Sequence, residues 1–115
     1  MATKSKCNAP ADKLALYEKL IETNPAIQRK GAANPYTSLN GHMFSRLDPS
    51  GKMALRLPAD EREKFLKKYR STLFKSYGVV QKEYVEVPDR LLANTRELKP
   101  YFEMSIRYIQ KLKPK

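Results

Sequence analysis

The side chains that could carry out acid–base or nucleophilic chemistry are scarce in this sequence. Its 115 residues include one histidine, His42, and one cysteine, Cys7. His42 could act as a general base only beside a partner that orients it and a nucleophile within reach, and the sequence indicates neither. Cys7 lies near Lys4 and Lys6, which could lower the pKa of the thiol, but we interpret it as an incidental thiol. We therefore expect no catalytic residues and no enzyme activity.

Metal and cofactor sites are equally unsupported. A structural zinc site usually gathers three or four ligands from cysteine, histidine and carboxylate side chains at short spacings. The four glycines are too scattered to form a phosphate-binding loop: Gly31, Gly41, Gly51 and Gly78. We therefore expect no metal and no cofactor.

The densest group of hydrogen-bonding side chains surrounds a predicted hairpin, after Asn34-Pro35. Tyr36 could stack on a ligand, while polar neighbours supply hydrogen bonds. The candidate ligand or partner surface consists of Tyr36, Ser38, Asn40 and His42. The same residue types also form turns and the polar faces of strands, and turn geometry alone explains Asn40-Gly41. We favour the structural interpretation and keep the binding site as the alternative.

Charge is the unusual property of the composition. Lys and Arg number 23 against 12 Asp and Glu, a formal net charge of +11. Such an excess calls for a partner of opposite sign, and tyrosines among the basic residues could stack on bases. The candidate phosphate contacts are Lys67, Lys68, Arg70, Lys75, Arg107, Lys111 and Lys113. The basic residues are nevertheless spread over both halves of the chain, so the charge could simply maintain solubility.

The length and composition indicate one domain, with no membrane span and no targeting signal. Apolar runs extend over only a few residues, whereas a spanning helix needs about 20. A single cysteine cannot form an intrachain disulfide, which fits a reducing compartment. We expect a cytoplasmic protein with a flexible segment at 1–9, a single domain at 10–112 and a basic tail at 113–115.

The first half of the chain predicts one helix followed by three antiparallel strands. Apolar residues at helical spacing indicate a helix from Ala11 to about Thr23, before Asn24-Pro25. Asn40-Gly41 favours positive φ at both central positions of a tight hairpin turn. The expected strands cover residues 36–39, 42–47 and 52–57. In the third strand, alternation predicts that Met53, Leu55 and Leu57 face the core while Lys52, Ala54 and Arg56 face largely water.

The second half predicts a helix, one or two strands and a final helix. Pro58 and the acidic residues after it open the helix, and Phe65, Leu66 and Tyr69 form its buried stripe. We interpret the residues up to Gly78 as a linker, expect a strand at least over residues 83–87, and expect a short turn around Leu91. Asn94 and Glu97 have the spacing of a capping box. Pro100 leaves two alternatives, a kinked helix from Thr95 or a helix that begins at Pro100.

Several segments together resemble a known family. They are Asn40-Gly41-His42-Met43-Phe44, residues 51–58, residues 82–88 with Leu91-Leu92, residues 98–102 and residues 112–115. They resemble small proteins similar to the N-terminal domain of TfoX/Sxy, over about residues 39–115. The resemblance implies a two-layer α+β fold in the order α-β-β-β-α-β-β-α, with a mostly antiparallel sheet packed by helices.

This chain departs from the family in two respects. Asn34-Pro35-Tyr36-Thr37-Ser38 stands where family members often carry a Met-Phe-Gly signature, and 115 residues leave no room for the C-terminal helical domain of the full-length competence regulators. The resemblance therefore implies a stand-alone module related to regulators of DNA-uptake genes. It supplies no catalytic residues.

Three functions follow as hypotheses. The first is a non-enzymatic cytoplasmic interaction or regulatory module of the TfoX N-terminal type, acting through a protein or homodimer surface. The second is sequence-independent nucleic-acid binding through a basic face. The third is a small-molecule enzyme that uses His42 with Tyr36. We favour the first, because the sequence contains no catalytic constellation.

Overall fold

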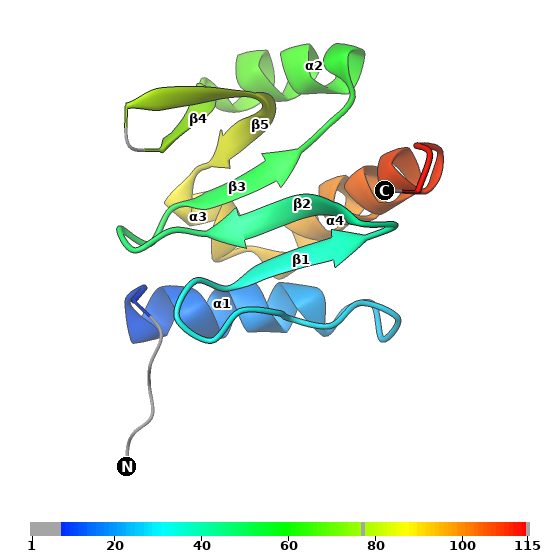
Figure 1. Cartoon of the computed structure of the whole chain (residues 1–115). Helices are drawn as coiled ribbons and strands as arrows, with labels where there is room; N and C mark the ends of the chain where they lie inside the picture. Colours follow the sequence, from blue (N-terminus) through cyan, green and yellow to red (C-terminus); the bar gives the residue numbers. More distant parts are fainter. Residues whose placement is uncertain (1–7, 77, 115) are drawn as a thin grey trace.

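The computed structural model describes residues 8–76 and 78–114, and Figure 1 shows their arrangement as a sheet packed by helices. Within these residues the sheet has five strands in the order β1-β2-β3-β5-β4, and every neighbouring pair is antiparallel. This confirms the α+β class and the expected element order. The elements are α1 (Ala11–Ile21), β1 (Tyr36–Leu39), β2 (His42–Leu47), β3 (Met53–Arg56), α2 (Ala59–Tyr69), β4 (Leu73–Ser76), β5 (Val79–Val87), α3 (Asp89–Leu92) and α4 (Thr95–Gln110).

Helices α1, α3 and α4 pack on one another, and α4 also lies against β1, β2 and β3 (Figure 1). Helix α2 packs beside β5. Fully buried aromatic side chains from four elements fill the space between the helices and the sheet: Tyr17, Phe44, Phe65 and Phe102. None of the described helices has the length and apolarity that a membrane crossing requires.

The N-terminal boundary of the folded part lies before α1. The main-chain nitrogen of Asn8 donates to the oxygen of Ala33 at 2.8 Å, and Ala9 is buried in the core. These two residues of the expected flexible segment are therefore held by the domain. Cys7 lies outside the described residues.

The hairpin between β1 and β2 has the predicted turn. Asn40 has φ +58° and Gly41 has φ +78°, so both central residues adopt the left-handed conformation that Asn-Gly favours. A two-residue turn of this kind matches the twist of the flanking strands. The hairpin register is thus set by its own turn residues.

A β-bulge in β2 directs two consecutive side chains to the helical face. Thr37 pairs with Ser45 and Ser38 pairs with Met43, so Phe44 has no partner of its own on β1. An extra residue interrupts the strict alternation of a strand. As a result both Phe44 and Ser45 are completely buried, which regular pleating would not allow.

The bulge attaches two different helices to β2. The Phe44 ring packs against Phe102 of α4, with the ring centroids 5.6 Å apart. The Ser45 hydroxyl lies 2.7 Å from the Tyr17 hydroxyl of α1 and 2.6 Å from that of Thr37 on β1. Burial raises the pKa of Tyr17 well above its ordinary value, so this chain of hydroxyls stays neutral.

The second face of β3 is not open to water as the alternation predicted. Met53, Leu55 and Leu57 are buried as expected, but Ala54 is fully buried too. Ala54 pairs with Arg46 of β2, whose guanidinium lies 5.7 Å from the centroid of the buried Phe74 ring of β4. Ala54 and Phe74 are both buried but lie outside the main core cluster, and Arg46 is a neighbour of each.

The C-terminal half differs from the sequence prediction in two places, and it resolves one alternative that the sequence left open. The supposed linker after α2 contains β4, and the turn around Leu91 is the one-turn helix α3. Helix α4 begins at Thr95, so the alternative that starts it at Pro100 is wrong. The Asn94 side chain accepts from the main-chain nitrogen of Glu97 at 3.2 Å, which satisfies an amide of the first turn as the capping box predicted.

The hydroxyl chain gives a test of this packing. Ser45→Ala removes the hydroxyl that Tyr17 and Thr37 share, so both of these buried hydroxyls lose that hydrogen-bond partner. We expect the free energy of unfolding to fall by about 2–4 kcal/mol, because each unsatisfied buried group costs about 1–3 kcal/mol. Tyr17→Phe preserves the Thr37–Ser45 bond and should cost about 1 kcal/mol. Urea titrations compare the two, and equal losses would contradict the shared role of Ser45.

Candidate functional site

The structure separates the four polar candidates of the β1–β2 hairpin. Residues alternate in direction along β1, so Tyr36 and Ser38 face away from Thr37, which is buried on the helical side. Ser38 accepts a hydrogen bond from Nζ of Lys30 at 2.8 Å. Asn40 forms the turn. These residues do not converge with His42 on one pocket.

His42 lies on the other side of the hairpin and contacts the C-terminal tail. It pairs across the strands with Leu39, which packs on the core. Its Nε2 atom lies 2.8 Å from the main-chain oxygen of Lys113, so a proton on Nε2 is donated to that carbonyl. Within the described part of the chain, no hydrogen bond joins His42 to a carboxylate or a side-chain hydroxyl.

The candidate phosphate contacts are all exposed and fall into two groups. The first is at the C-terminal end of α2 and on β4: Lys67, Lys68, Arg70 and Lys75. The second is at the end of α4 and beyond it: Arg107, Lys111 and Lys113. Arg70 caps α2 in the left-handed conformation, with φ +51°.

A groove between α2 and α4 brings members of both groups together. It consists of two adjoining hollows of about 510 and 310 Å³, both lined by Glu61 and Met104. Lys68 lines the larger hollow, and Arg107 and Lys111 line the smaller one. Carboxylates lie among these cations: Asp60, Glu61 and Glu97. The groove therefore carries both signs of charge and not a continuous basic surface.

Aromatic side chains hold the two helices together beneath this groove. The Phe65 ring lies 5.1 Å from Tyr101 and 4.7 Å from Tyr69, measured between centroids. The Tyr69 hydroxyl donates to Oε2 of Glu97 at 2.6 Å. Burial and this bond to a carboxylate raise the pKa of Tyr69, so it stays a hydrogen-bond donor.

The hairpin of β4 and β5 forms a distinct surface that we call the β4–β5 arm, residues 73–76 and 78–82. β5 pairs with β3 only through residues 84–87, while residues 79–81 pair with β4. The register changes sharply at the base of the arm, where Leu73 pairs with Val85 but Phe74 pairs with Gln81. Figure 1 shows β5 bending between these two halves.

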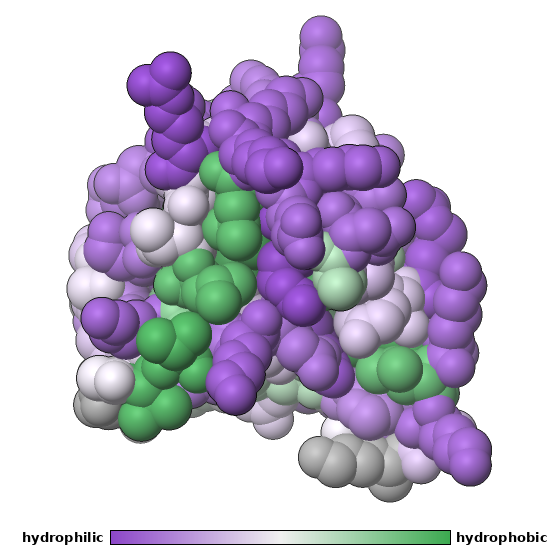
Figure 2. Space-filling view, turned by 90° about the horizontal axis from the view of Figure 1, so that it is seen from above, coloured by the Kyte–Doolittle hydropathy of each residue, from purple (hydrophilic) through white to green (hydrophobic). Residues whose placement is uncertain are grey.

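The arm carries the exposed large hydrophobic side chains of the described structure. The Val79 side chain is 59% exposed and that of Val80 is 44% exposed. Figure 2 views this end of the molecule and shows hydrophobic side chains gathered on the hairpin side, beside a hydrophilic surface. Consecutive strand residues point to opposite faces, so each face of the arm presents one valine.

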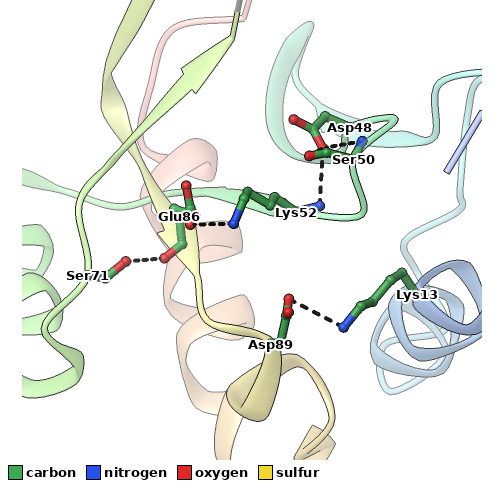
Figure 3. Close-up of polar contacts among 7 residues, drawn as sticks. All are labelled: Lys13, Asp48, Ser50, Lys52, Ser71, Glu86 and Asp89. Atoms are coloured by element: carbon green, nitrogen blue, oxygen red, sulfur yellow. Dashed lines mark hydrogen bonds and ion pairs between the residues drawn. The ribbon is translucent and has the colours of Figure 1, made fainter. Parts of the chain in front are cut away.

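Polar contacts fix the base of the arm to the sheet, as Figure 3 shows. The Ser71 hydroxyl donates to the main-chain oxygen of Glu86, and Nζ of Lys52 lies 3.2 Å from Oε2 of the same residue. The hydrogen bond and the charge of Glu86 raise the pKa of Lys52. Lys13 of α1 pairs with Asp89 of α3 at 3.3 Å. The contacts of Glu86 therefore lie on the part of β5 that pairs with β3, outside the arm.

Sequence reasoning missed the two valines as surface residues. The sequence predicted a strand at least over residues 83–87, and β5 begins earlier, at Val79. A signal was available, because two adjacent strand residues cannot both face one core. Both valines are exposed because this segment of β5 pairs with β4 alone, and the sequence does not indicate that pairing.

Neither a metal site nor a known relative assigns a function. Residues 8–76 and 78–114 contain no group of three or more His, Cys, Asp or Glu side chains that could hold a metal ion. No family model, no curated protein and no solved structure matches the chain. A function can therefore be inferred only from the surfaces of the protein described above.

The contact between His42 and the tail can be tested directly. His42→Ala removes the hydrogen bond to Lys113, so we expect faster motion of the amides of residues 111–113, with order parameters falling to below about 0.6. The free energy of unfolding should change by less than about 0.5 kcal/mol, because the contact is exposed. Nuclear magnetic relaxation measures the first and urea titration the second. Ser38→Ala is the control in the same hairpin, and unchanged tail motion in His42→Ala would contradict the assignment.

Proposed function

We propose that this protein is a non-enzymatic interaction module that binds another protein through the β4–β5 arm. The observation that carries the proposal is the exposure of Val79 and Val80 beside an edge strand of the sheet. Hydrophobic patches rimmed by polar residues are characteristic of protein–protein contact sites, and Figure 2 shows hydrophobic side chains gathered at this end of the molecule.

The charges of the α2–α4 groove support a protein partner over a nucleic acid. A phosphate backbone is attracted to cations, but in the groove Glu61 and Glu97 lie among Lys68, Arg107 and Lys111. Such carboxylates repel phosphate. The placement of His42 against a main-chain carbonyl likewise gives no support to the enzyme hypothesis.

The resemblance to the TfoX N-terminal domain gives the module a biological setting. The order of helices and strands agrees with what the resemblance implies. We propose on this basis that the chain acts in the cytoplasm as a regulatory adaptor related to competence regulators. The homodimer form of this proposal places a second copy of the chain on the arm.

Loss of the valines should abolish partner capture. Val79→Ser with Val80→Ser removes the apolar surface, so proteins retained from nuclease-treated native cytosol by the wild-type chain should be lost. Gln81→Ser on the same strand is the matched control and should retain them. Mass spectrometry compares the bound fractions, after circular dichroism has confirmed that each variant is folded. Equal retention by the valine variant would refute the arm as the binding surface.

The alternative is nucleic-acid binding, favoured by the exposed Lys67, Lys68, Arg70 and Lys75 at one end of the molecule. It predicts that fluorescence anisotropy with labelled DNA or RNA gives an affinity that falls steeply with salt. On duplex DNA, the logarithm of the binding constant should fall against the logarithm of the salt concentration with a slope of about −0.9 per phosphate contact. Lys67→Gln with Lys68→Gln should then reduce the slope by about two contacts. Absence of binding at about 50 mM salt would remove this alternative.

A further inference from the structure

The outer edge of β4 is open. Within residues 8–76 and 78–114, β5 is the only strand that pairs with β4. Among the described residues, the main-chain hydrogen bonds of β4 run to β5, and no loop or helix bonds to its other side. Helix α2, which precedes β4, packs beside β5. An unpaired edge presents a row of main-chain donors and acceptors to another chain.

The opposite edge of the sheet is protected at its start. Lys30 and Tyr36 exchange two main-chain hydrogen bonds, of 2.8 and 2.9 Å, on the outer side of β1. The Lys30 side chain continues along the strand to Ser38. The two edges therefore differ, and β4 is the one available for strand addition.

The charge around β4 selects the partner. Residues 72–82 contain Lys75 and Lys82 and no Asp or Glu, and both lysines are exposed. The nearest carboxylate along the chain, Glu83, is engaged by Nε of Arg56 at 2.6 Å. Val80 pairs with Lys75 across the hairpin, so one apolar and one cationic side chain stand side by side.

From these observations we propose that β4 accepts an extended, acidic and hydrophobic segment of another protein as a sixth strand of the sheet. The proposal rests on the proposed function and specifies its partner. Main-chain hydrogen bonds to β4 provide the affinity, and alternating side chains provide the specificity. The carboxylates of the segment lie beside Lys75 on the neighbouring strand β4, while Val80 lies one strand further in, on β5.

The same features disfavour a second copy of the chain. An edge lysine blocks the pairing of like strands, and two copies would each bring Lys75 to the shared edge. Each copy also carries a net charge of +11, which opposes association. An acidic segment meets neither obstacle.

Titration of the isotope-labelled protein with a synthetic peptide tests the mode of binding. The probe is an eight-residue capped peptide in which Glu alternates with Val or Thr. We expect the peptide to shift protein resonances only in residues 73–76 and 79–82, and to slow the hydrogen exchange of the β4 amides. A peptide methylated on alternate main-chain nitrogens should bind at least tenfold more weakly, as should one with Lys in place of Glu.

A charge reversal on the protein supplies the matched comparison. Lys75→Glu should weaken binding of the acidic peptide at least tenfold. Lys19→Glu, an equal change of charge on the exposed surface of α1, should alter the affinity less than twofold. Equal losses in both variants would show attraction by net charge alone and would overturn the proposal.

The remaining outcomes separate this inference from the proposed function. If partner capture depends on Val79 and Val80 but no acidic peptide binds up to millimolar concentration, the module stands and strand addition is wrong. If the methylated peptide binds as well as its parent, strand addition is again wrong. Sedimentation measures whether the protein dimerises. A dimer whose stability changes in Lys75→Glu would assign the edge of β4 to a second copy of the chain. Failure of both capture and peptide binding would refute both proposals.

Discussion

The β-bulge in β2 is the constraint on which the packing depends. A regular strand would bury one of Phe44 and Ser45 and expose the other, but the unpaired Phe44 allows both to face the helices. One side chain then contacts Phe102 of α4 and the other bonds to Tyr17 of α1. A single residue without a partner on β1 therefore fixes two helices on the same strand, and the β1–β2 hairpin cannot shift register without breaking both contacts.

Local chemistry in the sequence was sufficient to predict the elements whose ends are set by their own residues. Asn40-Gly41 specified the hairpin turn, and Asn94 with Glu97 indicated a helix start at Thr95, although Pro100 left a later start open. The bulge could not be predicted from the sequence, because the alternation of β2 is ambiguous until its pairing with β1 is known. The burial of Ala54 was missed for a related reason, since Arg46, which pairs with Ala54, and Phe74, over which Arg46 lies, come from strands whose positions are set by tertiary structure.

The candidate sites show the same division. Nearness in sequence suggested that Tyr36, Ser38 and His42 act together, but the two faces of the hairpin separate them. The two basic groups are distant in sequence, yet α2 and α4 bring Lys68, Arg107 and Lys111 to one groove, with carboxylates among them. Counting charges revealed the excess of cations but not their neighbours. The exposed valines depend on how far β5 extends past β3, which no local pattern encodes.

The bend in β5 divides this strand into two parts with different mechanical roles. Residues 84–87 pair with β3, and Val85 also pairs with Leu73 of β4. Residues 79–81, in contrast, pair with β4 alone. Local opening requires less free energy where fewer contacts must be broken. The distal hairpin can therefore fluctuate while the helices and the first three strands stay assembled. Evolution could change the sequence of this segment, and with it the choice of partner, without affecting the ability of the rest of the chain to fold.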